Sequence, residues 1–330
     1  MTTGRRGVAL TPMETRHELI VRAARLADEL GYEVFAVPEG WGLDSTLLLA
    51  ELARHTRRIT LVSAIVSVWG RTPATLAMTA ATLYRLAQGR YVLGLGTSTR
   101  ALVEGFHDVA FERPADKLRE VTTKVRALLA GERARLDHTA GARPLRLGLP
   151  PVPELPIWLA AMGERTSRVA AELGDGWIPA FVSPDRLAGR AAELGRARRA
   201  AGLRSGPFTV AAGPWTMADA DTGAARDAVA ACVAWYLTAM GDVYGRIVAG
   251  QGHGEAVEAI RAANPRPRPQ GGTVPAEARA VLEEFTAHGT PGQVREQLER
   301  WDAVADVTLV GLPPGLAWDA VAATLHAGAP

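Results

Sequence analysis

The stretch Arg90-Tyr91-Val92-Leu93-Gly94-Leu95-Gly96-Thr97-Ser98 has the pattern of an apolar strand that ends in small residues. It follows directly on a helical pattern over residues 72–89, which begins with a Thr-Pro pair and ends at a glycine. Small residues at the carboxyl end of a strand let a flat ring or a phosphate approach the backbone, because no side chain stands in the way. Parallel α/β folds place their chemistry at this end of their strands. We therefore expect a binding site that includes Gly94, Gly96, Thr97 and Ser98.

Two other interpretations of the same glycines stay open at this point. The spacing is partly that of a dinucleotide-binding fingerprint, but the third glycine is missing and the motif follows three strand–helix units instead of the first. Taken alone, two glycines also occur where a strand simply ends.

The order of strand and helix patterns along the chain predicts the fold class. Apolar strand patterns alternate with helical ones, at residues 8–10, 34–37, 59–66, 91–95, 157–160, 176–182, 208–212 and 307–310. Their continuous apolar character is typical of strands covered on both faces. Eight such units in 330 residues predict an α/β fold, a single (β/α)8 TIM-barrel domain over residues 1–330 with insertions. A doubly wound open sheet is the alternative.

The longest interruption of the alternation is an insertion at about residues 241–276. It contains Asn264-Pro265-Arg266-Pro267-Arg268-Pro269-Gln270-Gly271-Gly272, in which alternating Pro and Arg exclude a helix or a central strand. The segment is predicted to be a basic surface loop, or otherwise a lid or clamp for an anionic ligand.

Composition and charge limit the classes of partner. The formal net charge is +2 and the basic residues are spread along the chain, so neither nucleic acid nor a membrane surface is an expected partner. Residues 1–6 lack a signal-peptide core, which predicts a cytoplasmic location. Cys232 is the single cysteine, which excludes an intramolecular disulfide and a cysteine-rich metal site, and it is predicted to be buried in a helix. The seven histidines show no metal-ligand spacing, and we predict no metal.

An ordered set of motifs resembles one superfamily. The motifs are Val37-Pro38-Glu39-Gly40-Trp41-Gly42-Leu43-Asp44, Gly70-Arg71-Thr72-Pro73, Glu104-Gly105-Phe106-His107, Pro156-Ile157-Trp158-Leu159-Ala160-Ala161-Met162-Gly163 and Gly174-Asp175-Gly176-Trp177-Ile178-Pro179. Together with the stretch around Gly94 they resemble the bacterial luciferase-like superfamily of flavin and deazaflavin oxidoreductases, over about residues 8–185. The resemblance implies an oxidoreductase with a luciferase-like TIM barrel and a ring-shaped cofactor. It is closest to the branch that uses coenzyme F420, a deazaflavin, with FMN as the alternative.

The cofactor's contacts are predicted partly from the residues and partly from the resemblance. A strand exit that becomes a helix N-terminus offers free backbone donors to a phosphate, and here it comprises Ala161, Met162, Gly163 and Arg165. The resemblance adds Gly176 and Trp177 beside this phosphate. It also implies a non-proline cis peptide between Ala64 and Ile65, in a bulge behind the ring. Packing between barrel and helices is the alternative role for the Trp158 and Trp177 side chains.

Catalytic candidates leave the ends of strands two and four. Glu39 could hold or orient a proton, with a helix cap or a salt bridge as the alternative, and Trp41 lies in the same turn. His107 is a further candidate, because histidine is the side chain that ordinarily changes its charge near neutral pH, although such a histidine is also often structural. The deazaflavin dehydrogenases that this chain resembles typically carry a histidine where Gly40 stands, and the related sugar-phosphate dehydrogenases carry a catalytic glutamate where Thr99 stands. We therefore do not transfer their alcohol oxidation to this protein.

The resulting functional hypothesis is hydride transfer between the deazaflavin and a small molecule or peptide, as in the reduction of a C=C or C=N bond. The alternatives are a monooxygenase that receives reduced FMN from a separate flavin reductase, and a flavin-binding protein without turnover. A homodimer is expected by analogy. Substrate choice is expected to lie in the loops after strands seven and eight and in the insertion, where Trp215, Tyr236, Tyr244 and Arg246 are possible pocket residues, with core or surface roles as the alternative.

Overall fold

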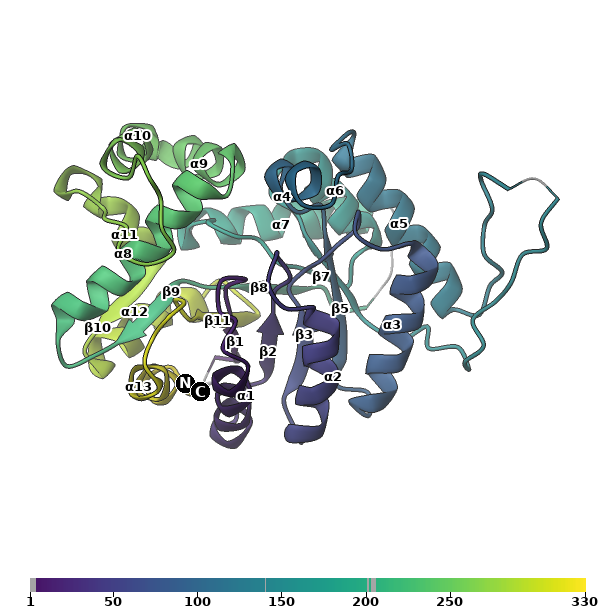
Figure 1. Cartoon of the computed structure of the whole chain (residues 1–330), viewed down its shortest axis with the longest axis horizontal. Coiled ribbons are helices and arrows are strands. Elements are labelled where there is room, and N and C mark those ends of the chain that lie inside the picture. Colours follow the sequence, from purple (N-terminus) through teal and green to yellow (C-terminus); the bar gives the residue numbers. More distant parts are fainter. Residues whose placement is uncertain (1–3, 140, 201, 203–205) are drawn as a thin grey trace.

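The strands close into a parallel barrel in the computed structural model, which describes residues 4–139, 141–200, 202 and 206–330 (Figure 1). Among these residues the eight barrel strands are β1 (Arg6–Ala9), β2 (Val34–Val37), β3 (Thr60–Ser63), β5 (Tyr91–Gly96), β6 (Ile157–Ala160), β7 (Gly176–Trp177), β8 (Thr209–Ala212) and β11 (Val307–Gly311). They pair in this order, and β11 pairs back onto β1. The predicted TIM barrel is confirmed, and the open doubly wound sheet is wrong because it would leave β1 and β11 apart. Residues 1–3 of the segment predicted to lack a signal-peptide core lie outside the described residues.

Helices cover the outside of the barrel, and local signals fix several of their ends. The covering helices are α1 (His17–Leu30), α2 (Ser45–His55), α3 (Pro73–Leu86), α5 (Pro114–Leu129), α6 (Glu164–Leu173), α7 (Pro184–Ala200), α8 (Thr222–Ala239), α12 (Pro291–Asp302) and α13 (Trp318–Ala327). α1 ends at Gly31, whose φ of 87° is the left-handed conformation that glycine adopts at no steric cost. α2 begins after Asp44, whose carboxylate accepts the N–H groups of Thr46 and Leu47.

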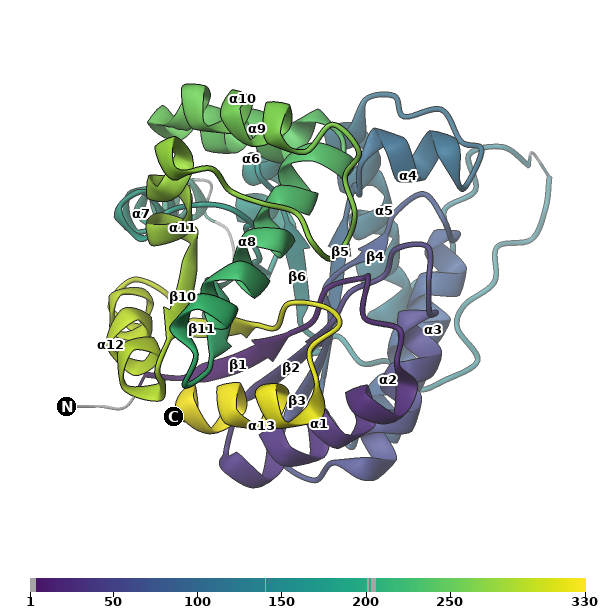
Figure 2. The ribbon, with the colours of Figure 1, turned by 60° about the vertical axis from the view of Figure 1, so that its left-hand side comes forward.

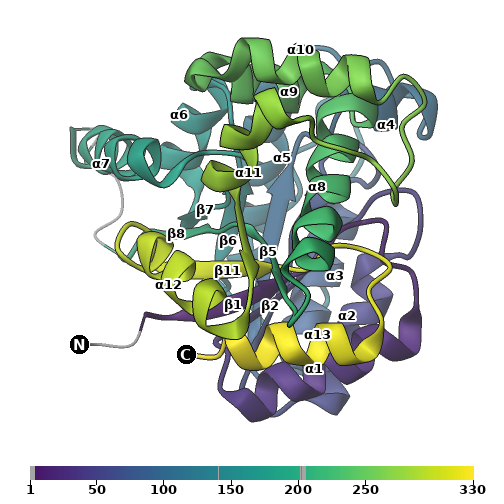
Figure 3. The ribbon, with the colours of Figure 1, turned by 90° about the vertical axis from the view of Figure 1, so that its left-hand side faces the viewer.

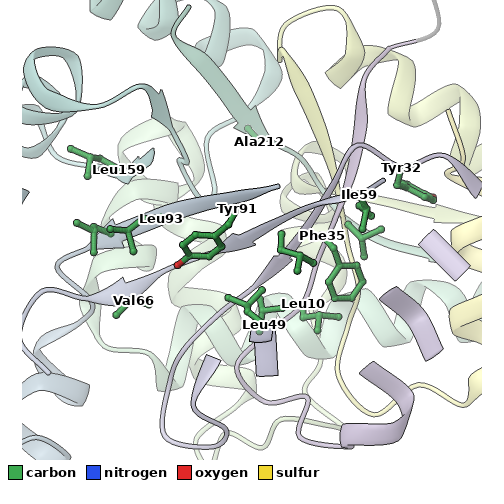
Figure 4. Close-up of a cluster of buried hydrophobic side chains, with 14 of the residues drawn as sticks. Leu10, Tyr32, Phe35, Leu49, Ile59, Val66, Tyr91, Leu93, Leu159 and Ala212 are labelled. Carbon is green, nitrogen blue, oxygen red and sulfur yellow. The ribbon is translucent and has the colours of Figure 1, made fainter. Parts of the chain in front are cut away.

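Side chains along each strand alternate between the outside and the inside of the barrel, and this separates two apolar regions. Outward-facing residues such as Phe35, Tyr91 and Leu93 pack against the helices in the larger core (Figure 4). Inward-facing residues such as Val62, Val92 and Trp158 form a smaller cluster inside the barrel. Complete burial of a large apolar side chain contributes roughly 1.5–3 kcal/mol, so both clusters stabilise the closed barrel.

Several elements differ from the sequence-based expectation. The third strand is interrupted, with β4 (Val66–Ser67) following β3 after a bulge, and the strand expected over 176–182 is only the two residues of β7. The short helix α4 (Arg100–Gly105) follows β5. β9 (Trp215–Ala218) and β10 (Thr286–Gly289) pair with each other beside the barrel. β9 leaves the barrel where the chain passes close to β11, since a Cβ on Gly213 would lie 1.9 Å from the Leu309 carbonyl oxygen.

The insertion folds into helices at the carboxyl end of the barrel strands. It contains α9 (Asp242–Val248), a π-helical segment (Ala249–His253) and α10 (Gly254–Ala263), and these lie on the same end of the barrel as α4 (Figures 1 and 3). Residues 264–275 form no helix or strand, as predicted, and cross α8 to reach a 3-10 turn (Ala276–Ala278) and α11 (Arg279–Phe285) (Figure 2). Cys232 is buried in α8, and this burial raises the pKa of its thiol.

Candidate active site

Small residues line the inner face of the barrel near the carboxyl ends of the strands. On β5, Leu93 and Leu95 pack outward against the helices, so Gly94 and Gly96 face the interior. Gly96 pairs with Ala160 of β6. Ala36 and Ala64 contribute further small side chains to the inner cluster or its edge. These positions carry no bulky side chain, whereas Trp158, the register partner of Gly94 on β6, contributes a large ring to the same inner face.

The bulge in the third strand explains why β5 needs its glycines. The peptide bond between Ala64 and Ile65 is cis, as the resemblance predicted. A Cβ on Gly94 would stand 1.8 Å from the Ser63 carbonyl oxygen, and one on Gly96 would stand 2.8 Å from the Ile65 side chain. Ser63 Oγ also accepts the Gly94 N–H at 2.9 Å. The bulge and the glycine pair are therefore one packed unit, which is more than two glycines that end a strand.

The residues after β5 turn sharply into α4. Ser98 has a φ of 56°, and the Trp69 indole donates to the Thr97 carbonyl at 3.0 Å. Thr99, which stands where the related dehydrogenases have glutamate, caps α4 by accepting the Leu102 N–H. Thr99 thus has a local structural role.

The predicted phosphate cradle has the geometry of an anion site. α6 begins after Gly163, and no side chain caps its first N–H groups. The N–H groups of Glu164, Arg165 and Thr166 have no intrahelical partner, because they belong to the first turn. The Arg165 guanidinium is turned to Asp116, at 3.3 Å, and is 74% exposed. The backbone of this turn is therefore better placed than the Arg165 side chain to hold a phosphate.

The two tryptophans of the β6–β7 region have different surroundings. Trp177 is fully buried between barrel and helices, and its indole donates to the Ala161 carbonyl at 2.6 Å. Its side chain therefore fixes the cradle's backbone from behind. Trp158 lies inside the barrel beside Gly176, where a Cβ would stand 2.5 Å from the Trp158 ring. Gly176 thus makes room for Trp158.

Glu39 is held in an ion-pair network. Its carboxylate oxygens accept two N–H groups of Arg71, at 2.5 and 2.9 Å, and the Ser45 hydroxyl at 3.1 Å. Arg71 also donates to Asp44 at 2.8 Å. The Glu39 and Arg71 side chains are only 13% and 17% exposed. This arrangement corresponds to the salt-bridge alternative for Glu39, and it ties the strand-two turn to the loop before α3.

Trp41 and His107 lie in two loops at the rim of the barrel, Trp41 after β2 and His107 after α4. Trp41 is 40% exposed and its ring centroid lies 6.5 Å from that of Trp235 in α8. The Trp235 indole nitrogen is buried and has no hydrogen-bond partner among the described residues. His107 is half-buried and packs against Gly70. Its imidazole has no hydrogen-bond partner within the described part of the chain.

Aromatic side chains form a cluster where β7 and β8 end. Trp215 and Tyr236 stack with centroids 5.1 Å apart, and Phe181 packs against both. Burial raises the pKa of Tyr244 to about 12. Tyr236 is buried in this cluster, Trp215 and Tyr244 are half-buried against it, and Arg246 is exposed.

Sequence reasoning gave no role to three residues that organise this region: Arg71, Trp235 and Gln251. Arg71 belongs to the Gly70-Arg71-Thr72-Pro73 motif. An arginine after the third strand and two carboxylates, Glu39 and Asp44, after the second strand are a pattern from which an ion pair could have been predicted. Gln251 donates to the Phe181 carbonyl at 2.6 Å and accepts the Ser183 N–H at 2.9 Å. No local pattern distinguishes such a glutamine, because its partners lie far away in the sequence.

The described residues contain no group of three or more His, Cys, Asp and Glu side chains placed to hold a metal ion. No helix among them combines the length and the apolar character needed to cross a membrane.

Comparison with known proteins places this geometry in a family. The family model described as luciferase-like monooxygenase matches residues 1–306. A Mycobacterium tuberculosis protein, named as a putative coenzyme F420-dependent oxidoreductase, is 30% identical over 331 residues, covering 93% of this chain and 92% of that protein.

Solved structures share the fold. A coenzyme F420 dependent tetrahydromethanopterin reductase from Methanopyrus kandleri has a TM-score of 0.77 at 20% identity, covering 99% of this chain and 98% of that chain. The oxygenating constituent of 3,6-diketocamphane monooxygenase from Pseudomonas putida, in complex with FMN, has a TM-score of 0.71 at 15% identity, covering 99% of each chain. At these identities the structural likeness concerns the fold alone. Since the family model spans residues 1–306, the chain belongs to the luciferase-like monooxygenase family.

Proposed function

We propose that this protein is an oxidoreductase that uses coenzyme F420 to transfer hydride to or from a small molecule or peptide. Reduction of a polarised C=C or C=N bond is the reaction form that we favour. The observation that carries the proposal is the 30% identity, across 93% of this chain, with a relative named for coenzyme F420. The M. kandleri structure, named for a reductase that depends on the same coenzyme, is consistent with it.

The residues present fit a deazaflavin with a phosphate. The bulge at Ile65 packs onto Gly94 and Gly96, and together with Ala64 it would form the surface against which a flat ring lies. The first turn of α6, which follows the neighbouring strand β6, offers uncapped N–H groups to the phosphate. When bound, the deazaflavin would supply the hydride chemistry.

The chain's own residues would orient the reactants and handle the proton. Trp41 and Trp235 form an apolar wall at the rim that excludes water from the ring's exposed side. Glu39 holds this turn in place through Arg71. His107 is our candidate for the proton donor or acceptor, because it is half-buried at the rim with a free imidazole.

A side-by-side titration with coenzyme F420 and FMN, each oxidised and reduced, tests this proposal. Ligand fluorescence and absorbance report binding, and FMN is the matched control because both ligands carry a tricyclic ring and a phosphate. We expect selective binding of the deazaflavin at micromolar concentration, followed by reoxidation of its reduced form with an unsaturated acceptor.

Each contrary result has its own meaning. Failure to bind the deazaflavin contradicts the proposal. Selective binding of reduced FMN with oxygen consumption would indicate the monooxygenase that depends on a separate flavin reductase. Tight binding without turnover of any acceptor would indicate a non-catalytic flavin-binding protein. The homodimer, which rests on analogy, is tested by light scattering on the same sample.

A further inference from the structure

A groove of about 470 Å³ begins at the phosphate cradle and runs between α7 and the insertion. Met162 of the cradle lines one end of it. Arg186 and Arg190, one turn apart on α7, line one side, and Arg246 of α9 lines the other. The groove therefore connects the cradle to three guanidinium groups, two from α7 and one from α9.

These arginines are charged groups without acidic partners. Arg186, Arg190 and Arg246 form no salt bridge with any described residue, whereas the neighbouring Arg165 and Arg168 of α6 pair with Asp116 and Glu164. Three guanidinium groups face one carboxylate, that of Glu193, among the described lining residues. Such an excess of one sign in a concave surface attracts an anion.

The groove is held in shape by hydrogen bonds from three elements. Gln251 of the π-helical segment joins the insertion to the start of α7, through its bonds to the Phe181 carbonyl and the Ser183 N–H. Ser183 is 1% exposed, and its hydroxyl has no partner among the described residues. Arg190 donates to Ser167 in the first turns of α6, at 3.2 Å. The Arg190 guanidinium thus lies between the cradle and the rest of the groove.

We propose that this groove binds the acidic tail of the deazaflavin cofactor. Coenzyme F420 differs from FMN in that its phosphate is a diester, which continues into a lactyl group and a chain of γ-linked glutamates. A chain that leaves a phosphate at the first turn of α6 passes Met162 and then meets Arg190, Arg186 and Arg246. Its carboxylates pair with these guanidinium groups. The inference rests on the proposed function.

Binding measurements with two forms of the cofactor test it. One form carries several glutamates and the other carries none, and fluorescence titration gives a Kd for each without any turnover. We expect the wild type to bind the long-tailed form more tightly at low salt, with the difference shrinking as salt is added. The double variant Arg186→Ala/Arg246→Ala is expected to lose about three- to tenfold in affinity for the long-tailed form, as two exposed charge pairs would give. Its affinity for the tail-free form stays unchanged.

The matched control is Arg196→Ala, which removes an exposed arginine from the same helix but outside the groove and is expected to change neither Kd. Unchanged circular dichroism and thermal midpoints show that the variants fold. Equal affinity of the wild type for both forms, or an equal loss for both forms in the double variant, overturns the tail site while leaving deazaflavin binding intact. Absence of binding for either form overturns the proposed function itself.

Discussion

At Gly94 the fold leaves no room for any side chain, because a Cβ would stand 1.8 Å from the Ser63 carbonyl oxygen. Backbone cannot rotate away as a side chain can, so β5 or the bulge must shift. We expect Gly94→Ala to lower the free energy of unfolding by about 3 kcal/mol and to weaken deazaflavin binding. Chemical denaturation and ligand titration measure the two effects.

Gly96→Ala is the matched control on the same strand. Its Cβ would meet the end of the Ile65 side chain, at 2.8 and 3.0 Å, and that side chain can change rotamer. A loss of about 1 kcal/mol is expected. Equal losses in the two variants would contradict the view that the Ser63 carbonyl, and not general crowding, requires glycine at position 94.

For single residues, the sequence predicted the positions that require a small side chain. It did not predict contacts between residues that are far apart in the chain. Gly94, Gly96 and the Ala64–Ile65 bond lie where the motifs placed them. The partners of Glu39 were not predictable in the same way. The Arg71 guanidinium reaches Glu39 only because parallel strands bring the two exits together.

The same difference holds for helices and strands. Helix caps depend on neighbouring residues in the sequence, whereas strand pairing depends on distant ones. Gly31 at the end of α1 and Asp44 before the start of α2 are such local caps. β9 and β10 were missed, since each is four residues long and is stabilised by pairing with a strand from a distant part of the sequence. The strand expected over 176–182 was too long because its apolar residues serve two purposes: Trp177 packs outward, while Phe181 belongs to the aromatic cluster of the insertion.

Asp28 shows how one carboxylate joins two elements. It lies near the end of α1 and accepts the backbone N–H groups of Arg57, Arg58 and Ile59, at 2.8, 2.8 and 2.6 Å, just before β3. Burial raises the pKa of Asp28, but these three donors and the Arg58 charge outweigh it and hold the pKa below its ordinary value of 3.8. The folded state therefore favours the ionised form.

This lowered pKa predicts a pH-dependent contribution to stability. The contribution is fully present above the unfolded-state pKa and is lost as the pH falls through the lower folded-state pKa. We expect Asp28→Asn to lower the free energy of unfolding by about 1–2 kcal/mol at pH 7. This difference from the wild type should become smaller below about pH 4. Denaturant titrations from pH 7 to pH 3 measure it. Asp116→Asn, at an exposed surface pair, is the control, and a gap for Asp28→Asn that widens at low pH would contradict the assignment.

For the whole molecule, closure of the barrel joins the first and last elements of the chain. β1 pairs with β11, and α1 lies beside α13 (Figures 2 and 3). The wall of small residues, the cradle and the rim come from the exits of β2, β3, β5 and β6, which the closed ring holds in position. The geometry of the site therefore depends on the seam between β1 and β11, although no site residue lies on β1.

Arg6 links β1 to the elements that precede and follow β11, namely α12 and the end of α13. Its guanidinium donates to Asp302 at 2.6 Å and to the Gly328 carbonyl at 3.3 Å, and its side chain is 9% exposed. We expect Arg6→Met to lower the free energy of unfolding by about 3 kcal/mol, since it leaves the largely buried Asp302 charge unpaired. The neighbouring Arg5 pairs with Glu33 at the surface and is 55% exposed, so Arg5→Met should cost less than about 1 kcal/mol. Thermal and denaturant unfolding of both variants decide the point. If both variants lose the same free energy of unfolding, the specific contacts of Arg6 do not stabilise the closed ring.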